Sequence, residues 1–181
     1  EDDTRHIARV IAEFDGYPLR VTRELTKLHE VESDVRNIAT EAPIALVVVD
    51  HAQAMARAMG GEERLTLAQI ATSLQCLADD LECPVILVSQ MSTDMSGASY
   101  SMGSRSIDQN ASLIIRIDRG EPGTTVEERQ RSPEMQLSCL KGREGEPFGT
   151  IDCHADFARC RIYDQQQWAA REERERATRA R

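Results

Sequence analysis

Three polar residues follow two apolar runs, at positions where a sheet protein could use them for chemistry. Asp50 follows the run at residues 44–49, and Ser89 and Gln90 follow the run at 84–88. Continuous runs rich in β-branched residues are typical of strands buried on both faces. Ligands of parallel α/β sheets bind at the carboxyl ends of the strands, so these residues are candidates for one site.

Asp50 has two interpretations when it is considered alone. An apolar strand that ends in Asp has the pattern of a Walker B strand, whose carboxylate holds the Mg²⁺ of a nucleotide directly or through a water. Many buried strands also end in an Asp that caps the next helix. Gln90 likewise suits either a ligand sensor or an ordinary hydrogen-bonding group at a strand end.

The elements around the two runs decide the fold class. Apolar residues recur at helical spacing on both sides of the first run, and Gly16 and Pro43 are typical of helix ends. The expected elements are helices at residues 4–14, 28–40 and 66–81, an extended stretch at 17–21, and a loop at 55–64. Helices that alternate with buried strands predict an α/β parallel sheet.

The second half is expected to contain shorter strands and more loops. The expected elements are strands at residues 113–117, 135–140, 150–153 and 159–163, one or two helical turns at 106–111, irregular segments at 92–104 and 118–133, and a polar tail at 165–181. Trp168 is the one large apolar residue of that tail. Lys141 and Arg143 stand in a glycine-rich turn between two of the strands, where a solvated hairpin turn is the simplest interpretation.

Composition limits the class of protein. The 181 residues are enough for one domain, with 40% hydrophobic and 29% charged residues. The net charge of −9 argues against broad coating of DNA or of an anionic membrane, although it leaves room for a local basic channel. No apolar run approaches the roughly 20 residues of a membrane span.

The cysteines and the first residues indicate the compartment and the extent of the chain. Five cysteines without a C-x-x-C pair are expected to be buried free thiols in a reducing cytoplasm. The chain opens with Glu1-Asp2-Asp3, whereas a signal peptide begins with basic residues. It also opens without Met, so we expect a fragment or a processed product.

Several segments, taken together, resemble the RecA-like ATPase domain of replicative DnaB-type helicases. They are, in order, VVVDHAQAM, ERLTLAQIATSLQCLADDLECPVILVSQMS, SRSIDQNASLIIRIDR and LSCLKGREGEPFGTI. The similarity extends over most of residues 17–163. It implies a RecA-like, mostly parallel sheet flanked by helices, with a C-terminal antiparallel extension. Residues 1–164 would then form a partial ATPase domain, followed by the charged tail.

The resemblance also implies roles for individual residues. Asp50 would hold Mg²⁺, through a water, and Gln90 would sense the γ-phosphate of ATP. Arg143 would be an arginine finger that reaches the nucleotide of a neighbouring subunit, with Lys141 beside it. Such a finger offsets charge on the transferred phosphoryl group and contributes about 10³–10⁵ in rate. Arg105 is the candidate contact to single-stranded DNA.

The sequence departs from the family pattern at several points. It has no G-x-x-x-x-G-K-[ST] motif, so the loop that cradles the phosphates is missing, and so is a recognisable catalytic Glu. We expect both to lie upstream in the parent protein. Residues 102–105 read Met-Gly-Ser-Arg where the family commonly has Arg-Glu-Ser-Gly. His51 replaces a common aromatic residue and is expected to be a hydrogen-bonding group rather than a base.

Two functions follow from this pattern. The first is part of an ATP-dependent, DnaB-type helicase or translocase that acts as a hexameric ring in the cytoplasm. The alternative is a RecA-like module that binds nucleotide and regulates or assembles without unwinding DNA. The Ser89-Gln90 and Lys141-Gly142-Arg143 elements favour the motor, whereas the missing phosphate loop and the altered DNA segment favour the module. A generic α/β domain without ATP chemistry is a third, simpler possibility.

The missing phosphate loop generates the first prediction. The 181-residue chain alone should release phosphate from ATP only at the background rate, because no loop holds the β- and γ-phosphates. A steady-state phosphate-release assay measures this. Robust turnover by the purified chain would reveal a phosphate site that the sequence does not contain in the usual form.

Overall fold

The computed structural model describes most of the chain. The described residues are 2–24, 27–93, 99–101, 107, 109–120, 125, 128, 132–143 and 149–179. Structural statements below concern these residues. Arg105, the candidate DNA contact, lies outside them.

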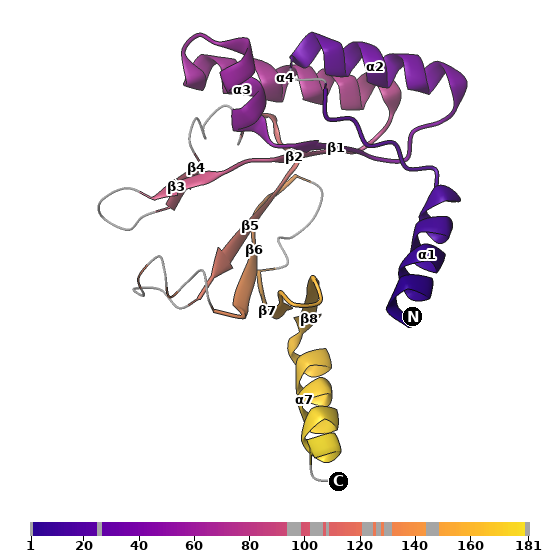
Figure 1. The fold of residues 1–181 in the computed structure, drawn as a ribbon. Coiled ribbons are helices and arrows are strands. Elements are labelled where there is room, and N and C mark those ends of the chain that lie inside the picture. Colours follow the sequence, from indigo (N-terminus) through magenta and orange to yellow (C-terminus); the bar gives the residue numbers. More distant parts are fainter. Residues whose placement is uncertain are drawn as a thin grey trace.

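The N-terminal half is an α/β unit built on one pair of parallel strands. Its elements are α1 (Asp2–Asp15), α2 (Leu28–Glu41), β1 (Val47–Asp50), α3 (Ala52–Met59), α4 (Glu63–Leu81) and β2 (Val85–Val88). In β1 and β2, Val47 pairs with Val85 and Asp50 pairs with Val88. Helices α2 and α4 cover one face of the pair, while α1 projects away from it (Figure 1).

The apolar stripe of α4 forms the centre of the core. Leu67, Ile70 and Leu77 are fully buried, at the helical spacing that the sequence predicts. They pack with residues of α2, β1 and α3, among them Val49 and Met55. The opposite face of the strand pair is open: Val48, Ile86 and Val88 are 55%, 50% and 41% exposed. The described residues therefore cover the sheet on one side only.

The C-terminal half is antiparallel. Its elements are β3 (Met91–Thr93), β4 (Ser99–Ser101), β5 (Leu113–Arg119), β6 (Glu134–Gly142), β7 (Thr150–Asp156), β8 (Arg161–Asp164) and α7 (Gln165–Arg179). β3 pairs with β4, and the larger sheet has the order β5-β6-β7-β8. Both the α/β class and the antiparallel extension are thereby confirmed.

The tail expected at residues 165–181 is a helix through Arg179, and aromatic and ionic contacts anchor it. The Trp168 ring stacks on His154 with 5.0 Å between centroids. Arg171 lies 2.5 Å from the Asp156 carboxylate, which Arg159 also contacts at 2.9 Å. Hydrogen bonds, first from Arg159 and then from Arg171, hold the pKa of Asp156 below its ordinary value. The contacts to β7 join residues that lie apart along the chain, so the local pattern did not indicate them.

The prediction of a loop at residues 55–64 is wrong for most of that range. Residues through Met59 belong to α3, and α4 begins at Glu63. The helix forms because Ala52, Met55 and Ala56 lie on one face and are buried in the core. The two glycines do end it: Gly60 and Gly61 have φ of 75° and 86°, which L side chains rarely adopt.

Several smaller expectations also need correction. Residues 92–93 and 99–101, expected to be irregular, belong to the paired strands β3 and β4. The strand β5 continues through Arg119, because its ladder with β6 runs that far. The strand β7 continues through Asp156, because its last residues pair with β8. Of the cysteines, Cys83 and Cys153 are buried as expected, while Cys76 and Cys160 are exposed and Cys139 is half-buried. None of the helices in the described ranges is long and apolar enough to cross a membrane.

Two leucines on α4 provide a test of this core. Leu67 is fully buried, whereas Leu65 is 64% exposed. Leu67→Ala in the 181-residue chain should lower the free energy of unfolding by about 2–5 kcal/mol, because it removes buried methyl groups and leaves a cavity. Leu65→Ala should change it by less than about 0.5 kcal/mol. Urea denaturation midpoints measure both, and equal shifts would contradict the orientation of α4.

Candidate functional site

Asp50 occupies the open end of β1. Its side chain is 76% exposed, while that of the preceding Val49 is buried in the core. Alternation along the strand explains this difference, since successive side chains point to opposite faces. The Nδ1 atom of His51 lies 3.6 Å from Asp50 Oδ1, and the peptide bond between the two residues is cis. The carboxylate is therefore open to a cation in solvent, with His51 as its neighbour.

Ser89 and Gln90 lie at the same edge of the sheet. They follow β2 directly, and Val88, the last residue of β2, is the partner of Asp50 in the ladder. The structure therefore brings the predicted strand-end residues together. The side chain of Gln90 is exposed, whereas its backbone donates one hydrogen bond to, and accepts one from, a single side chain of α3.

That side chain is Gln53, which sequence reasoning missed. Gln53 is 3% exposed. Its Nε2 atom donates to Ser89 Oγ at 2.9 Å and to the carbonyl of Gln90 at 3.1 Å. Its Oε1 atom accepts from the Gln90 N–H at 3.0 Å. The available signal was an amide on the buried face of an otherwise apolar helical turn, shortly after Asp50.

Lys141 and Arg143 lie together at another position, the end of β6. The Arg143 N–H donates to the Ser112 carbonyl at 2.9 Å, which joins this end of β6 to the start of β5. Lys141 Nζ donates to the Gln109 carbonyl at 3.3 Å, and the guanidinium of Arg143 donates to the same oxygen. Both cations are thus gathered on one backbone carbonyl, and the Arg143 side chain remains exposed.

The residues at the strand ends fit Mg²⁺ bound with a nucleotide. Mg²⁺ keeps several waters and is commonly held by one or two carboxylates plus phosphate oxygens, rather than by a cage of protein ligands. The single exposed carboxylate of Asp50 suits that arrangement. Among the described residues, no group of three or more His, Cys, Asp or Glu side chains gathers to form a complete metal site.

The fold and these strand ends define a RecA-like α/β domain, and solved structures agree. A solved ATPase domain superposes with a TM-score of 0.73 at 16% identity, over 91% of this chain and 61% of that one. A DnaB-like replicative helicase, solved in a study of its interactions with primase, gives a TM-score of 0.68 at 17% identity. That match covers 87% of this chain and 40% of the helicase chain.

Sequence comparison adds the family. Residues 1–161 match the sequence model of the DnaB-like helicase C terminal domain, and the chain belongs to that family. The resemblance on which the site residues were chosen is therefore confirmed. Helix α7 begins at Gln165, beyond the matched residues.

Individual relatives are replicative helicases. The replicative DNA helicase DnaB of Mycobacterium intracellulare is 29% identical over 161 residues, which is 83% of this chain and 27% of the helicase. That of Pasteurella multocida is 37% identical over 132 residues, covering 67% of this chain and 27% of the helicase. The chain thus spans about a quarter of the length of these relatives.

Proposed function

We propose that this chain is part of the ATP-hydrolysing motor of a DnaB-type helicase, which moves on DNA as a hexameric ring in the cytoplasm. The observation that carries the proposal is the meeting of Asp50 with Ser89-Gln90 at the carboxyl ends of two adjacent parallel strands. Membership of the DnaB-like helicase family supports the activity and the ring. The phosphate-cradling loop and the catalytic Glu are supplied by residues outside this chain.

Asp50 and Gln90 have different tasks in this proposal. Asp50 would hold Mg²⁺, through a water, and bound Mg²⁺–ATP would supply the phosphoryl group that is transferred to water. Gln90 follows the strand that pairs with β1, and its side-chain amide would sense the γ-phosphate of bound ATP. The exposure of both side chains supports these tasks, because neither needs to leave the core to meet a ligand.

Arg143 acts across a subunit boundary. Its side chain is exposed, and its contact is a backbone carbonyl that water or a phosphate oxygen can replace. The guanidinium offers five fixed donors, which suit a phosphoryl group in transfer. Lys141 binds the same carbonyl and so keeps the two cations together. Arg105, in the segment that precedes β5, contacts single-stranded DNA.

Substitution of Asp50 tests the metal role. In the full-length parent protein, Asp50→Ala should reduce Mg²⁺-dependent ATP hydrolysis to background while sparing assembly, because it removes the metal-side carboxylate, which is 76% exposed and takes no part in the core. Phosphate release and analytical ultracentrifugation measure the two properties. Asp79→Ala, which removes an exposed carboxylate from α4, is the matched control and should hydrolyse ATP normally. Normal turnover by Asp50→Ala would end the Walker B assignment.

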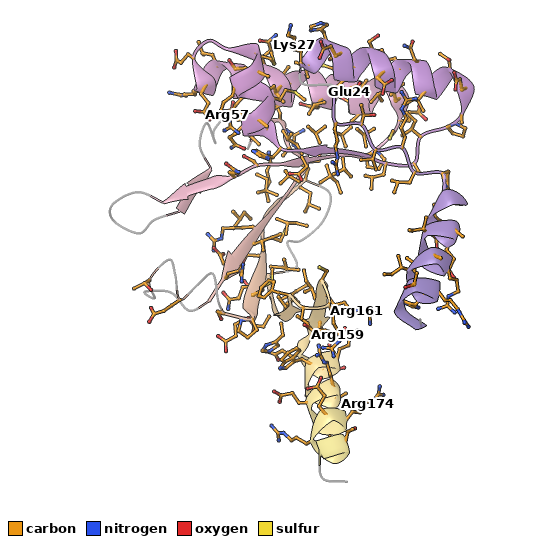
Figure 2. The ribbon with its side chains drawn as sticks, viewed as in Figure 1. Glu24, Lys27, Arg57, Arg159, Arg161 and Arg174 are labelled. Carbon is orange, nitrogen blue, oxygen red and sulfur yellow. The ribbon has the colours of Figure 1, made fainter. Side chains whose placement is uncertain are left out.

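Arg143 is tested by mixing subunits of the full-length parent. Arg143→Ala should leave nucleotide binding nearly intact and cut hydrolysis by about 10³, because a finger acts on charge that develops during transfer. Rings mixed from Arg143→Ala and Asp50→Ala subunits should regain activity at interfaces where one partner supplies the metal site and the other the finger. Arg57→Ala, an exposed arginine of α3 (Figure 2), is the control and should be neutral. Absence of complementation would leave Arg143 a surface charge.

A further inference from the structure

Gln53 is a buried polar side chain that the proposed chemistry does not use directly. It stands in the first turn of α3, and its neighbours on that buried face are Ala52, Met55 and Ala56. Burying an amide without partners is unfavourable, and its place in an apolar face calls for a specific compensating interaction. The compensation comes from the two residues that follow β2.

The amide of Gln53 acts as a substitute for a neighbouring peptide group. The β1–β2 ladder ends at the pair Asp50 and Val88, because the chain turns after Asp50 into α3. The backbone N–H and C=O of Gln90, which follow the end of β2, would then lack a partner in β1. Gln53 satisfies both the N–H and the C=O of Gln90, as a peptide of an adjacent strand would, and also binds Ser89 Oγ.

We infer that Gln53 is a positioning residue. Its side-chain amide takes the place of a backbone peptide group beyond the last β1–β2 pair and thereby fixes Gln90 at the same sheet edge as Asp50. This rests on the proposed function, in which Gln90 responds to the nucleotide. We call the three hydrogen bonds of the Gln53 side chain the clamp. Because α3 begins at Ala52, one short segment carries both the carboxylate of Asp50 and the residue that forms the clamp. A displacement at the end of β1 is transmitted to Gln90 through these hydrogen bonds.

The position requires glutamine for geometric and chemical reasons. The bonds need two N–H donors and one acceptor on one planar group, which an amide provides. Glu keeps the acceptor for the Gln90 N–H but loses both donors. Leu has a similar size and keeps none. Gln53→Leu therefore removes all three bonds, and Gln53→Glu replaces the bond to the Gln90 carbonyl with two facing acceptor oxygens.

Amide hydrogen exchange in the 181-residue chain measures the clamp directly. Gln53→Leu should speed exchange of the Gln90 amide about tenfold or more, since roughly 1.4 kcal/mol of local opening free energy corresponds to a factor of ten. Exchange at Ile70 and Leu74 in α4 should not change. Gln53→Glu should also speed exchange of the Gln90 amide, because a buried carboxylate oxygen would face the Gln90 carbonyl. Gln69→Leu, an exposed glutamine of α4, is the control for the Gln-to-Leu change and should affect neither.

Kinetics in the full-length parent then connect the clamp to the reaction. Gln53→Leu should lower kcat for Mg²⁺–ATP hydrolysis about tenfold or more and leave KM within about twofold, because the sensor is misplaced while the nucleotide still binds. Ser89→Ala removes one partner only and should change kcat in the same direction by less.

Three results would overturn the inference. The first is equal exchange of the Gln90 amide in the unsubstituted chain and in Gln53→Leu. The second is equal acceleration at Gln90 and in α4, which would mean general loosening. The third is a loosened Gln90 amide with unchanged kcat. Failure of the proposed function has a different signature: the full-length parent would not hydrolyse ATP even without a substitution, while the exchange pattern would still follow Gln53.

Discussion

The register of β1 with β2 is the constraint on which the rest of the site depends. Val49 faces the core and pairs with Leu87, so Asp50 must face the open side. A slip of one residue would turn the carboxylate into the apolar layer under α4 and bring Val49 to solvent. The fully buried leucines of α4 oppose such a slip, because each burial contributes about 1.5–3 kcal/mol. The packing of α4 on one face of the β1–β2 pair thus fixes the position of the Asp50 carboxylate at the end of β1.

The same constraint explains which features could be predicted from sequence. The strands that end at Asp50 and Val88 and the helix around Ile70 follow from local apolar patterns, which report burial directly. Asp50 and Gln90 as strand-end residues follow from them. The anchoring of α7 could not be predicted in this way, because Trp168 stacks on His154 in a tertiary contact. Gln53 was missed for a related reason: its partners lie 36 and 37 residues further along the chain.

The β1–β2 pair is covered on one face only by the described residues. Parallel sheets are found almost always with both faces covered, because their strands are apolar on both sides. The β1–β2 pair follows that composition, yet Val48 and Ile86 are about half exposed among the described residues. In β5, Ile115 and Ile117 are 48% and 57% exposed. The sequences of β1 and β2 are thus those of a doubly covered sheet, whereas β5, in the antiparallel sheet, alternates isoleucine with Arg116 and Asp118.

Two kinds of attachment hold the proposed functional groups, and the difference matches their tasks. Gln90 is held through its backbone by a buried side chain, which fixes the base of its own side chain and leaves the amide tip free. The backbone N–H of Arg143 is also held, by the Ser112 carbonyl, but the guanidinium at the tip of the exposed side chain rests on the Gln109 carbonyl that Lys141 shares. Hydrogen bonds in water exchange at little net cost, whereas buried ones without a substitute partner do not. A sensor must report a position accurately and so needs the buried clamp, while a finger must leave its resting contact and so needs the exchangeable one.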